Sequence, residues 1–159
     1  MKQTYVVIVE DTPGALNRIV NQFRRRNINI QSLAVAPCEQ QNISRVTIVV
    51  NDIPDERQEI YAQTLKNLVD VIEVQSVYGD SHIIRENLLV KFSLPSVNEK
   101  DIRKLTENKN VSILEDKGSS FIVEAMGTSK EIDKLLFDLG KFDDVEFVRS
   151  GSVAISRHN

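Results

Sequence analysis

Residues 11–16 have the types and spacing of a site for a small anion. Thr12 suits the position before a helix, because its hydroxyl can accept an unpaired N–H of the first turn. Pro13 suits the first helical position, and Gly14 has no Cβ, so another molecule can approach the main chain closely. The free N–H groups and the positive dipole end of such a helix attract a carboxylate. A capped helix start explains the same residues without a ligand, and these residues alone favour that structural role.

Groups that could catalyse a reaction are few. The only histidines are His82 and His158, and neither has a spacing that would complete a metal site with Cys38. Cys38 has no histidine near it in the sequence, so we expect a spectator and not a nucleophile. The adjacent carboxylates Glu10 and Asp11 point to opposite faces of a strand, which argues against an acid–base pair. We therefore predict no catalytic residue, no metal site and no cofactor in this chain, and a protein that binds and regulates.

Size and composition are typical of a globular protein in a reducing compartment. The chain has 159 residues, of which 41% are apolar and 27% are charged. No apolar run approaches the roughly 20 residues of a membrane span, and residues 1–4 lead directly into a strand, so we expect no membrane segment and no secretory signal. A single cysteine excludes an internal disulfide, and the net charge of −3 argues against nucleic-acid binding. These observations favour a cytoplasmic protein.

The first half of the chain is predicted to run strand, helix, strand, strand, helix, strand. Apolar patterning places these elements at residues 5–9, 13–26, 29–36, 44–50, about 55–69 and 70–77. The basic run Arg24–Arg26 falls in the last turn of the first helix, where cations complement the dipole, and Asn27 can take the left-handed conformation that ends the helix. The inner face of the second helix is predicted to consist of Ile60 or Tyr61, Thr64, Leu65, Leu68 and Val69.

The same order of elements returns after the turn-forming segment 78–81. Elements are predicted at residues 87–94, 98–107, 111–115, 120–125, 128–139 and 145–149, with residues 153–155 extending the last strand. Thr128 and Glu131 form a capping box, which is followed by an apolar helix face that stops at Gly140: Ile132, Leu135, Leu136 and Leu139. The doubled order predicts an α+β protein of two ferredoxin-like (βαββαβ) sandwiches, one at residues 1–78 and one at 79–159.

The strands at residues 5–9 and 44–50 are apolar on both sides of the pleat. Strands of this kind are usually buried on both faces, whereas two helices can cover only one face of a four-stranded sheet. We therefore predict that the first sheet is covered or extended by another chain or by the second half, and that the protein is an oligomer and not a monomer.

The chain resembles the small regulatory subunits of acetohydroxyacid synthase (acetolactate synthase), in which the first half is an ACT domain. The resembling segments are residues 10–16, 23–37, 44–48 and 68–71 in the first half, and 85–91 and 149–151 in the second. The most specific matches are Asn29-Ile30-x-Ser32-Leu33 and the later Arg149-Ser150-Gly151. The resemblance covers nearly the whole chain, in order and with similar spacing.

This resemblance implies a subunit that activates a catalytic large subunit and confers feedback inhibition by valine or a related branched-chain amino acid. Thiamine diphosphate, magnesium and FAD would belong to that large subunit, which acts in valine, isoleucine and leucine biosynthesis. The resemblance also implies a homodimer of ACT domains joined edge to edge, with the effector at the interface. The effector-binding residues carried over are Asp11, Gly14, Ala15, Leu16, Asn29 and Ile30.

The roles of these residues follow from their chemistry. Gly14, Ala15 and Leu16 would offer main-chain N–H groups to the effector's carboxylate, and the Asn29 amide can both donate and accept. Ile30, Leu33 and Val35 would supply apolar lining, although Val35 is equally suited to the core. Asn29 is also a common residue in the turn after a helix.

Asp11 is a departure from the family, which commonly has asparagine at this position. An ionised aspartate cannot donate to the effector's carboxylate, and two like charges near 4 Å repel by roughly 1 to 4 kcal/mol, depending on exposure. Either Asp11 turns towards the effector's ammonium group or the affinity falls. We therefore expect weaker valine sensitivity than in relatives with asparagine, or a different effector.

Three other functions remain open. The first is a free-standing ACT-type amino-acid sensor that regulates another enzyme or gene expression. The second is a small enzyme that uses His82 or Cys38. The third is a nucleic-acid-binding protein that uses Arg24–Arg26, Lys104 and Lys109, which the negative net charge disfavours.

Overall fold

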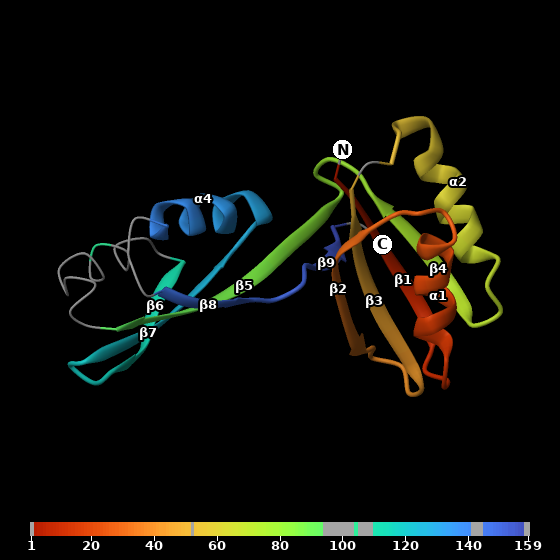
Figure 1. The fold of residues 1–159 in the computed structure, drawn as a ribbon. Helices are drawn as coiled ribbons and strands as arrows, with labels where there is room; N and C mark the ends of the chain where they lie inside the picture. Colours follow the sequence, from red (N-terminus) through yellow and green to blue (C-terminus); the bar gives the residue numbers. More distant parts are fainter. Residues whose placement is uncertain (1, 52, 94–103, 105–109, 141–144, 158–159) are drawn as a thin grey trace. The chain divides into compact units, whose positions relative to one another are not determined.

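The computed structural model describes residues 2–51, 53–93, 104, 110–140 and 145–157 (Figure 1). The chain divides into two compact units, one made of Met1–Ile83 with Gly151–Asn159 and the other of Ile84–Ser150. The boundary predicted between residues 78 and 79 differs from this division, because residues 79–83 and the C-terminal segment both pack with the first unit.

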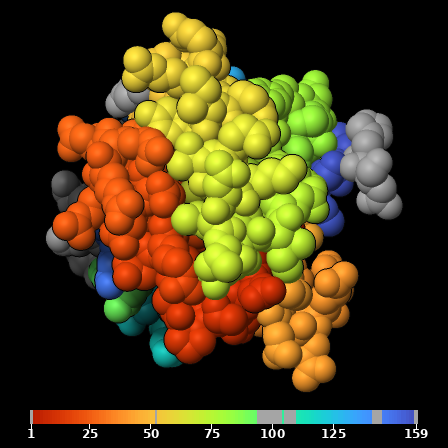
Figure 2. All heavy atoms as spheres, turned by 90° about the vertical axis from the view of Figure 1, so that its right-hand side faces the viewer, coloured from red at the N-terminus to blue at the C-terminus, as the bar shows by residue number. Residues whose placement is uncertain are grey.

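The first unit is a four-stranded antiparallel sheet with two helices. Its elements are β1 (Gln3–Glu10), α1 (Ala15–Arg24), β2 (Ile30–Pro37), β3 (Ile43–Val50), α2 (Asp55–Lys66) and β4 (Val71–Val77). The strand order is β2-β3-β1-β4, so β2 and β4 are the edges. The two helices lie side by side over one face of the sheet, α1 in orange-red and α2 in yellow (Figures 1 and 2). This arrangement confirms the predicted ferredoxin-like order.

Alternate residues of β1 and β3 form the core beneath the helices. Tyr5 is fully buried there, with its ring centroid 6.2 Å from that of Phe23 and its hydroxyl donating to Gln58 O at 3.1 Å. The buried members of this core are Tyr5, Val7, Val9, Ala15, Ile19, Phe23, Val46, Ile48, Val50, Ile53, Ala62 and Leu65.

The opposite face of the same sheet is also buried. Val6, Thr47 and Val49 point away from the helices, yet at most 2% of each residue's surface is exposed. Ser32 pairs with Val49 and therefore shares this face, and its Oγ accepts from Ser152 N at 3.1 Å. The C-terminal segment therefore lies on the face away from the helices, so the chain itself supplies a cover for the first sheet.

The second unit repeats the plan. Its described elements are β5 (His82–Ser93), β6 (Val111–Asp116), β7 (Ser120–Gly127), α4 (Ser129–Leu139) and β8 (Val145–Arg149), with strand order β6-β7-β5-β8. The predicted hairpin of residues 111–115 and 120–125 is confirmed by the pairing of β6 with β7. The buried core is formed by Leu88, Val90, Phe92, Val111, Phe121, Val123, Ala125, Ile132 and Leu139. Apart from Lys104, which is helical, the helix predicted at residues 98–107 lies outside the described residues, as do residues 141–144 and His158.

The predicted extension of the closing strand is confirmed, whereas the predicted face of α2 is wrong in part. After the break at residues 150–152, β9 (Val153–Ser156) pairs with β5 as β8 does, and Arg157 N donates to Ser81 O at 2.9 Å. In α2 the buried residues are Gln58, Ala62 and Leu65, with Tyr61 and Leu68 packed beside them. Ile60 lies two positions from both Gln58 and Ala62, so it points to the opposite side of the helix and is 62% exposed. Val69 is 87% exposed because the helix has already ended at Lys66.

The capping box at the start of α4 is present as predicted. Thr128 Oγ1 accepts from Glu131 N at 3.4 Å, and Thr128 N donates to Glu131 Oε2 at 2.7 Å. These bonds, the one from the Thr128 main chain first, hold the pKa of the Glu131 carboxyl below its usual value. The helix ends at Leu139, and Gly140 forms its C-cap.

Replacing Thr128 with alanine removes the side-chain half of the capping box. We expect the opening free energy of α4 to fall by about 1 kcal/mol, which corresponds to roughly fivefold faster hydrogen exchange of its amides. Because the folded pKa of Glu131 is lowered, the stabilising effect of its charge is present above the usual glutamate pKa of about 4.3 and is lost as the pH falls through the lowered value. Lys130→Ala, on an exposed residue of the same turn, is the control, and equal exchange in both variants would contradict the prediction.

Candidate functional site

The loop between β1 and α1 contains four of the predicted effector-binding residues. The helix begins at Ala15 and not at Pro13, and Gly14 is the N-cap residue with φ of +88° and no side-chain cap. The predicted capping role of Thr12 is wrong, because its hydroxyl donates to Asp70 Oδ1 at 3.1 Å instead. The Thr12 main chain still contributes to the helix start, since its carbonyl accepts from Ala15 N at 3.1 Å.

Asp70, which lies just before β4, holds this loop in place. Its carboxylate accepts from Arg18 Nε and, at 2.8 Å, from Arg18 Nη2, as well as from Thr12. Its main-chain oxygen accepts from Glu10 N at 2.9 Å. A single residue therefore connects the end of β1, the loop and the first turns of α1. Only 10% of the Asp70 side chain is exposed, against 42% of the Arg18 side chain.

The electrostatics of this cluster favour the charged form of Asp70. Hydrogen bonds from Arg18, and to a lesser extent from Thr12, hold the pKa of the Asp70 carboxyl below its usual value, although burial acts in the opposite direction. Sequence reasoning missed both Asp70 and Arg18 as parts of the site. The only available signal was that Asp70 lies in a segment that resembles the family, because nothing local pairs two residues that are 52 positions apart.

Gly14 is required at its position for two reasons. Its φ of +88° lies in the left-handed region, which disfavours a side chain, and a Cβ built on it would lie 3.1 Å from Arg18 Nη1. Three main-chain N–H groups were predicted to bind the effector, and one of them, the N–H of Ala15, already donates to Thr12 O. Within the described part of the chain, the N–H groups of Gly14 and Leu16 have no protein acceptor, so these two remain available for a carboxylate.

Asp11 is exposed at the edge of the same loop. Its N–H donates to Asn42 O at 2.8 Å, which fixes the main chain, while its carboxylate makes no hydrogen bond with any described residue. The side chain is therefore able to turn either towards or away from a bound molecule.

Asn29 and Ile30 line a separate pocket. This pocket of about 370 Å³ lies at the C-terminal end of α1 and is lined by Val20, Arg24, Asn27, Ile28, Asn29 and Ile30. Asn27 has a φ of +55°, which confirms the left-handed residue predicted after the helix. Of the other predicted lining residues, Leu33 packs against the core, whereas Val35 is 47% exposed and is not part of the core.

The structure brings residues 11–16 together but does not bring Asn29 and Ile30 to them. The two groups lie at opposite ends of α1, whose ten residues span about 15 Å. That distance is much longer than a free amino acid such as valine. A ligand that touches both groups therefore needs two copies of the chain.

The edge strand β2 offers a surface for such a second copy. Among the described strands, β2 pairs only with β3, through residues 30–37. Apart from Ser32 and Leu33, which Gly151 and Ser152 contact, its outer edge is therefore available to extend the sheet into another chain.

His82 and Cys38, the residues considered for catalysis, are not arranged as a catalytic pair. The His82 ring nitrogens contact Ser81 Oγ at 2.8 Å and Gln75 Oε1 at 3.3 Å, and burial lowers the pKa of the imidazole. Cys38 is partly exposed and is not disulfide-bonded. Over the ranges that the structure describes, no group of three or more histidine, cysteine, aspartate or glutamate residues could hold a metal ion, and no helix is long and apolar enough to cross a membrane.

The fold and the loop define the first unit as an ACT domain, and comparisons with known proteins agree. Residues 6–73 match the model of the AHAS small subunit-like ACT domain, and residues 85–158 match that of the small subunit of acetolactate synthase. The chain belongs to the family of acetolactate synthase small subunits, which confirms the resemblance found in the sequence.

Individual relatives match along at least nine tenths of their length. The acetolactate synthase small subunit of Mycolicibacterium smegmatis is 34% identical over 154 residues, which cover 97% of this chain and 90% of that one. The small subunit of acetolactate synthase isozyme 3 of Escherichia coli is also 34% identical, over 99% of this chain and 96% of its own. The crystal structure of the acetolactate synthase small subunit from Thermotoga maritima superposes with a TM-score of 0.83 and 26% identity, over 100% of this chain and 99% of that one.

Replacing Asp70 with asparagine removes the charge that holds Arg18 and Thr12. We expect the first unit to melt at a lower temperature near pH 7. Because the folded pKa of Asp70 is lowered, its stabilising contribution is present above the usual aspartate pKa of about 3.9 and is lost as the pH falls through the lowered value. The difference between variant and wild type should therefore shrink in acid.

Tyrosine fluorescence measures this change in the first unit, because all three tyrosines, Tyr5, Tyr61 and Tyr78, lie there. Asp80→Asn, in an exposed turn, is the matched control. Identical melting curves for Asp70→Asn and the wild type at pH 7 would show that the ion pair has no role in stability.

Proposed function

We propose that this chain is the regulatory subunit of an acetolactate synthase. It binds the catalytic large subunit, activates it, and confers feedback inhibition by valine or a related branched-chain amino acid. The observation that carries this proposal is the match to acetolactate synthase small subunits along the whole chain, with an ACT domain in the first half. Catalysis belongs to the large subunit, which would hold thiamine diphosphate, magnesium and FAD, and the complex would work in the cytoplasm.

The effector site in this proposal is shared by two copies of the chain. The Gly14 and Leu16 N–H groups of one copy bind the effector's carboxylate, and the positive end of the α1 dipole adds to this attraction. Asn29 and Ile30 come from the second copy, because they lie at the other end of α1. The free edge of β2 supports this pairing, since it can join two sheets into one.

The orientation of Asp11 decides the affinity for the effector. Its carboxylate has no hydrogen-bond partner among the described residues, so it can accept from the effector's ammonium group. If it faces the effector's carboxylate instead, the repulsion amounts to roughly 1 to 4 kcal/mol.

The proposed partnership is tested by co-expression with the cognate large subunit. We expect the two chains to copurify, and acetolactate formation by the large subunit to rise when this chain is added. Valine should then inhibit the complex but not the large subunit alone. A large subunit that neither binds this chain nor responds to it would overturn the proposal and would favour a free-standing amino-acid sensor.

The effector site is tested by isothermal titration of valine into the full chain. We expect Asp11→Asn to bind valine more tightly, by roughly tenfold for each 1.4 kcal/mol of repulsion removed. Equal and tight affinities in the two proteins would show that Asp11 does not face the effector's carboxylate.

Gly14→Ala should weaken valine binding, because a side chain at φ +88° is strained and its Cβ would crowd the Arg18 guanidinium. Gly118→Ala is the matched control, since Gly118 also has a positive φ, of +71°, but lies in the turn between β6 and β7 with open space around it. Loss of binding in both variants would indicate general misfolding and not a local site.

A further inference from the structure

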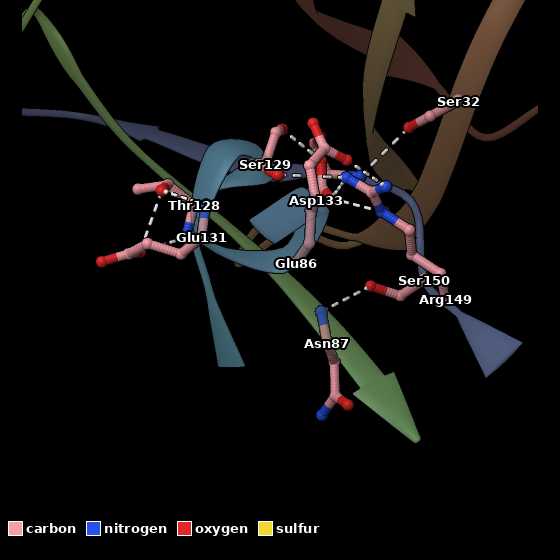
Figure 3. Close-up of polar contacts among 10 residues, drawn as sticks. Ser32, Glu86, Asn87, Thr128, Ser129, Glu131, Asp133, Arg149 and Ser150 are labelled. Atoms are coloured by element: carbon pink, nitrogen blue, oxygen red, sulfur yellow. Dashed lines mark hydrogen bonds and ion pairs between the residues drawn. The ribbon is translucent and has the colours of Figure 1, made fainter. Parts of the chain in front are cut away.

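The end of β8 is fixed within the second unit by an ion-pair cluster. Glu86, with 3% of its side chain exposed, accepts from Arg149 Nε at 2.7 Å and from the Ser129 hydroxyl. Arg149 Nη1 also donates to Asp133 Oδ1 at 2.6 Å, so the guanidinium lies among Glu86, Ser129 and Asp133 (Figure 3). Buried and charge-assisted bonds of this kind hold a side chain in one geometry.

The next residue is held just as firmly. Ser150 N donates to Asn87 O at 2.9 Å, and Ser150 Oγ accepts from Asn87 N at 2.9 Å (Figure 3). Two reciprocal bonds therefore fix the last residue of the second unit to β5. The peptide bond that follows carries the chain into the first unit.

Gly151 and Ser152 are fixed to β2 in the first unit. A Cβ built on Gly151 would lie 3.0 Å from Leu33 O and 3.2 Å from Ser32 Oγ, so only glycine fits without displacing this strand. Ser152 N donates to Ser32 Oγ at 3.1 Å, and Ser152 is only 1% exposed.

The contact lies next to an irregularity in β2. Ile30 pairs with Val50 and Ser32 pairs with the adjacent Val49, so Gln31 is an extra residue in the ladder. Such a bulge is a local break in the pairing, and bulges are frequent beside binding sites. On one side of the bulge lie Asn29 and Ile30, which belong to the proposed effector site, and on the other side lies the contact with Gly151.

We propose that residues 149–152 are a coupling segment that links the effector site to the second unit. Binding of the effector at the start of β2 changes the bulge at Gln31 and moves Ser32 and Leu33. Gly151 and Ser152 follow, because they are in contact with these two residues, and the movement reaches Ser150 and Arg149 through the main chain. This inference rests on the proposed function, since it explains how effector binding at the same site changes the second unit.

Two variants weaken the segment without touching the effector-binding residues. Gly151→Ala places a methyl group against Leu33 O, and Ser32→Ala removes only the acceptor of the Ser152 N–H. Gly140→Ala is the control for the first, since a Cβ there would lie no closer than 3.4 Å to any atom. Ser112→Ala, at an exposed position in β6, is the control for the second. Melting curves show whether each variant folds.

The readout is hydrogen exchange of the full chain with and without saturating valine, together with valine inhibition of the complex with the large subunit. In the wild type we expect valine to slow exchange in β8, at residues 145–149, by about fivefold, the lower end of typical allosteric couplings. In Ser32→Ala and Gly151→Ala this slowing and the inhibition should be lost, while the affinity for valine in isothermal titration stays within about threefold of the wild type. The two controls should behave as the wild type.

The outcomes separate the coupling from the proposed function. A wild type that binds valine but shows no change in β8 overturns the coupling segment and leaves the effector site standing. Variants that fold, bind valine and remain fully inhibited also overturn it. A wild type that binds neither valine nor the large subunit overturns the proposed function itself, and the coupling segment with it.

Discussion

The carboxylate of Asp70 accepts hydrogen bonds from both Arg18 and Thr12, while its main-chain oxygen accepts from Glu10. These bonds determine where the chain leaves β1 and where α1 begins. They draw the Thr12 hydroxyl away from the helix, so that Gly14 becomes the N-cap and the N–H groups that follow are not blocked by a capping side chain. The arrangement of the loop therefore depends on one largely buried acid that lies just before β4, far along the sequence.

Local patterns predicted local structure well. The capping box at Thr128 and the left-handed Asn27 are present because each depends only on residues within one turn. The doubled strand and helix order is also present, since periodicity reports which face of each element is buried. Of the two residues offered for the start of the α2 inner face, Tyr61 packs beside the core and Ile60 does not. Val69 was wrong because it lies beyond the end of the helix at Lys66.

Contacts between residues far apart in the sequence could not be predicted from local patterns. No pattern within α1 indicates that Arg18 pairs with Asp70, and nothing near Ser32 indicates that its hydroxyl accepts from Ser152 N. For the candidate site, the resemblance to a family supplied the residues, whereas the structure supplied their separation along α1. In the proposed effector site, these two groups would therefore come from different copies of the chain.

The position of residues 151–157 on the first sheet affects how the protein is made. These residues are synthesised after the whole second unit, yet they belong to the unit whose other residues are synthesised before it. During synthesis, residues 151–157 cannot cover the face of the sheet that carries Val6 and Val49 until the second unit has been synthesised. Such long-range closure slows folding and leaves apolar strands open to aggregation in the meantime. A nascent chain truncated before residue 151 would therefore lack a part of its own amino-terminal half.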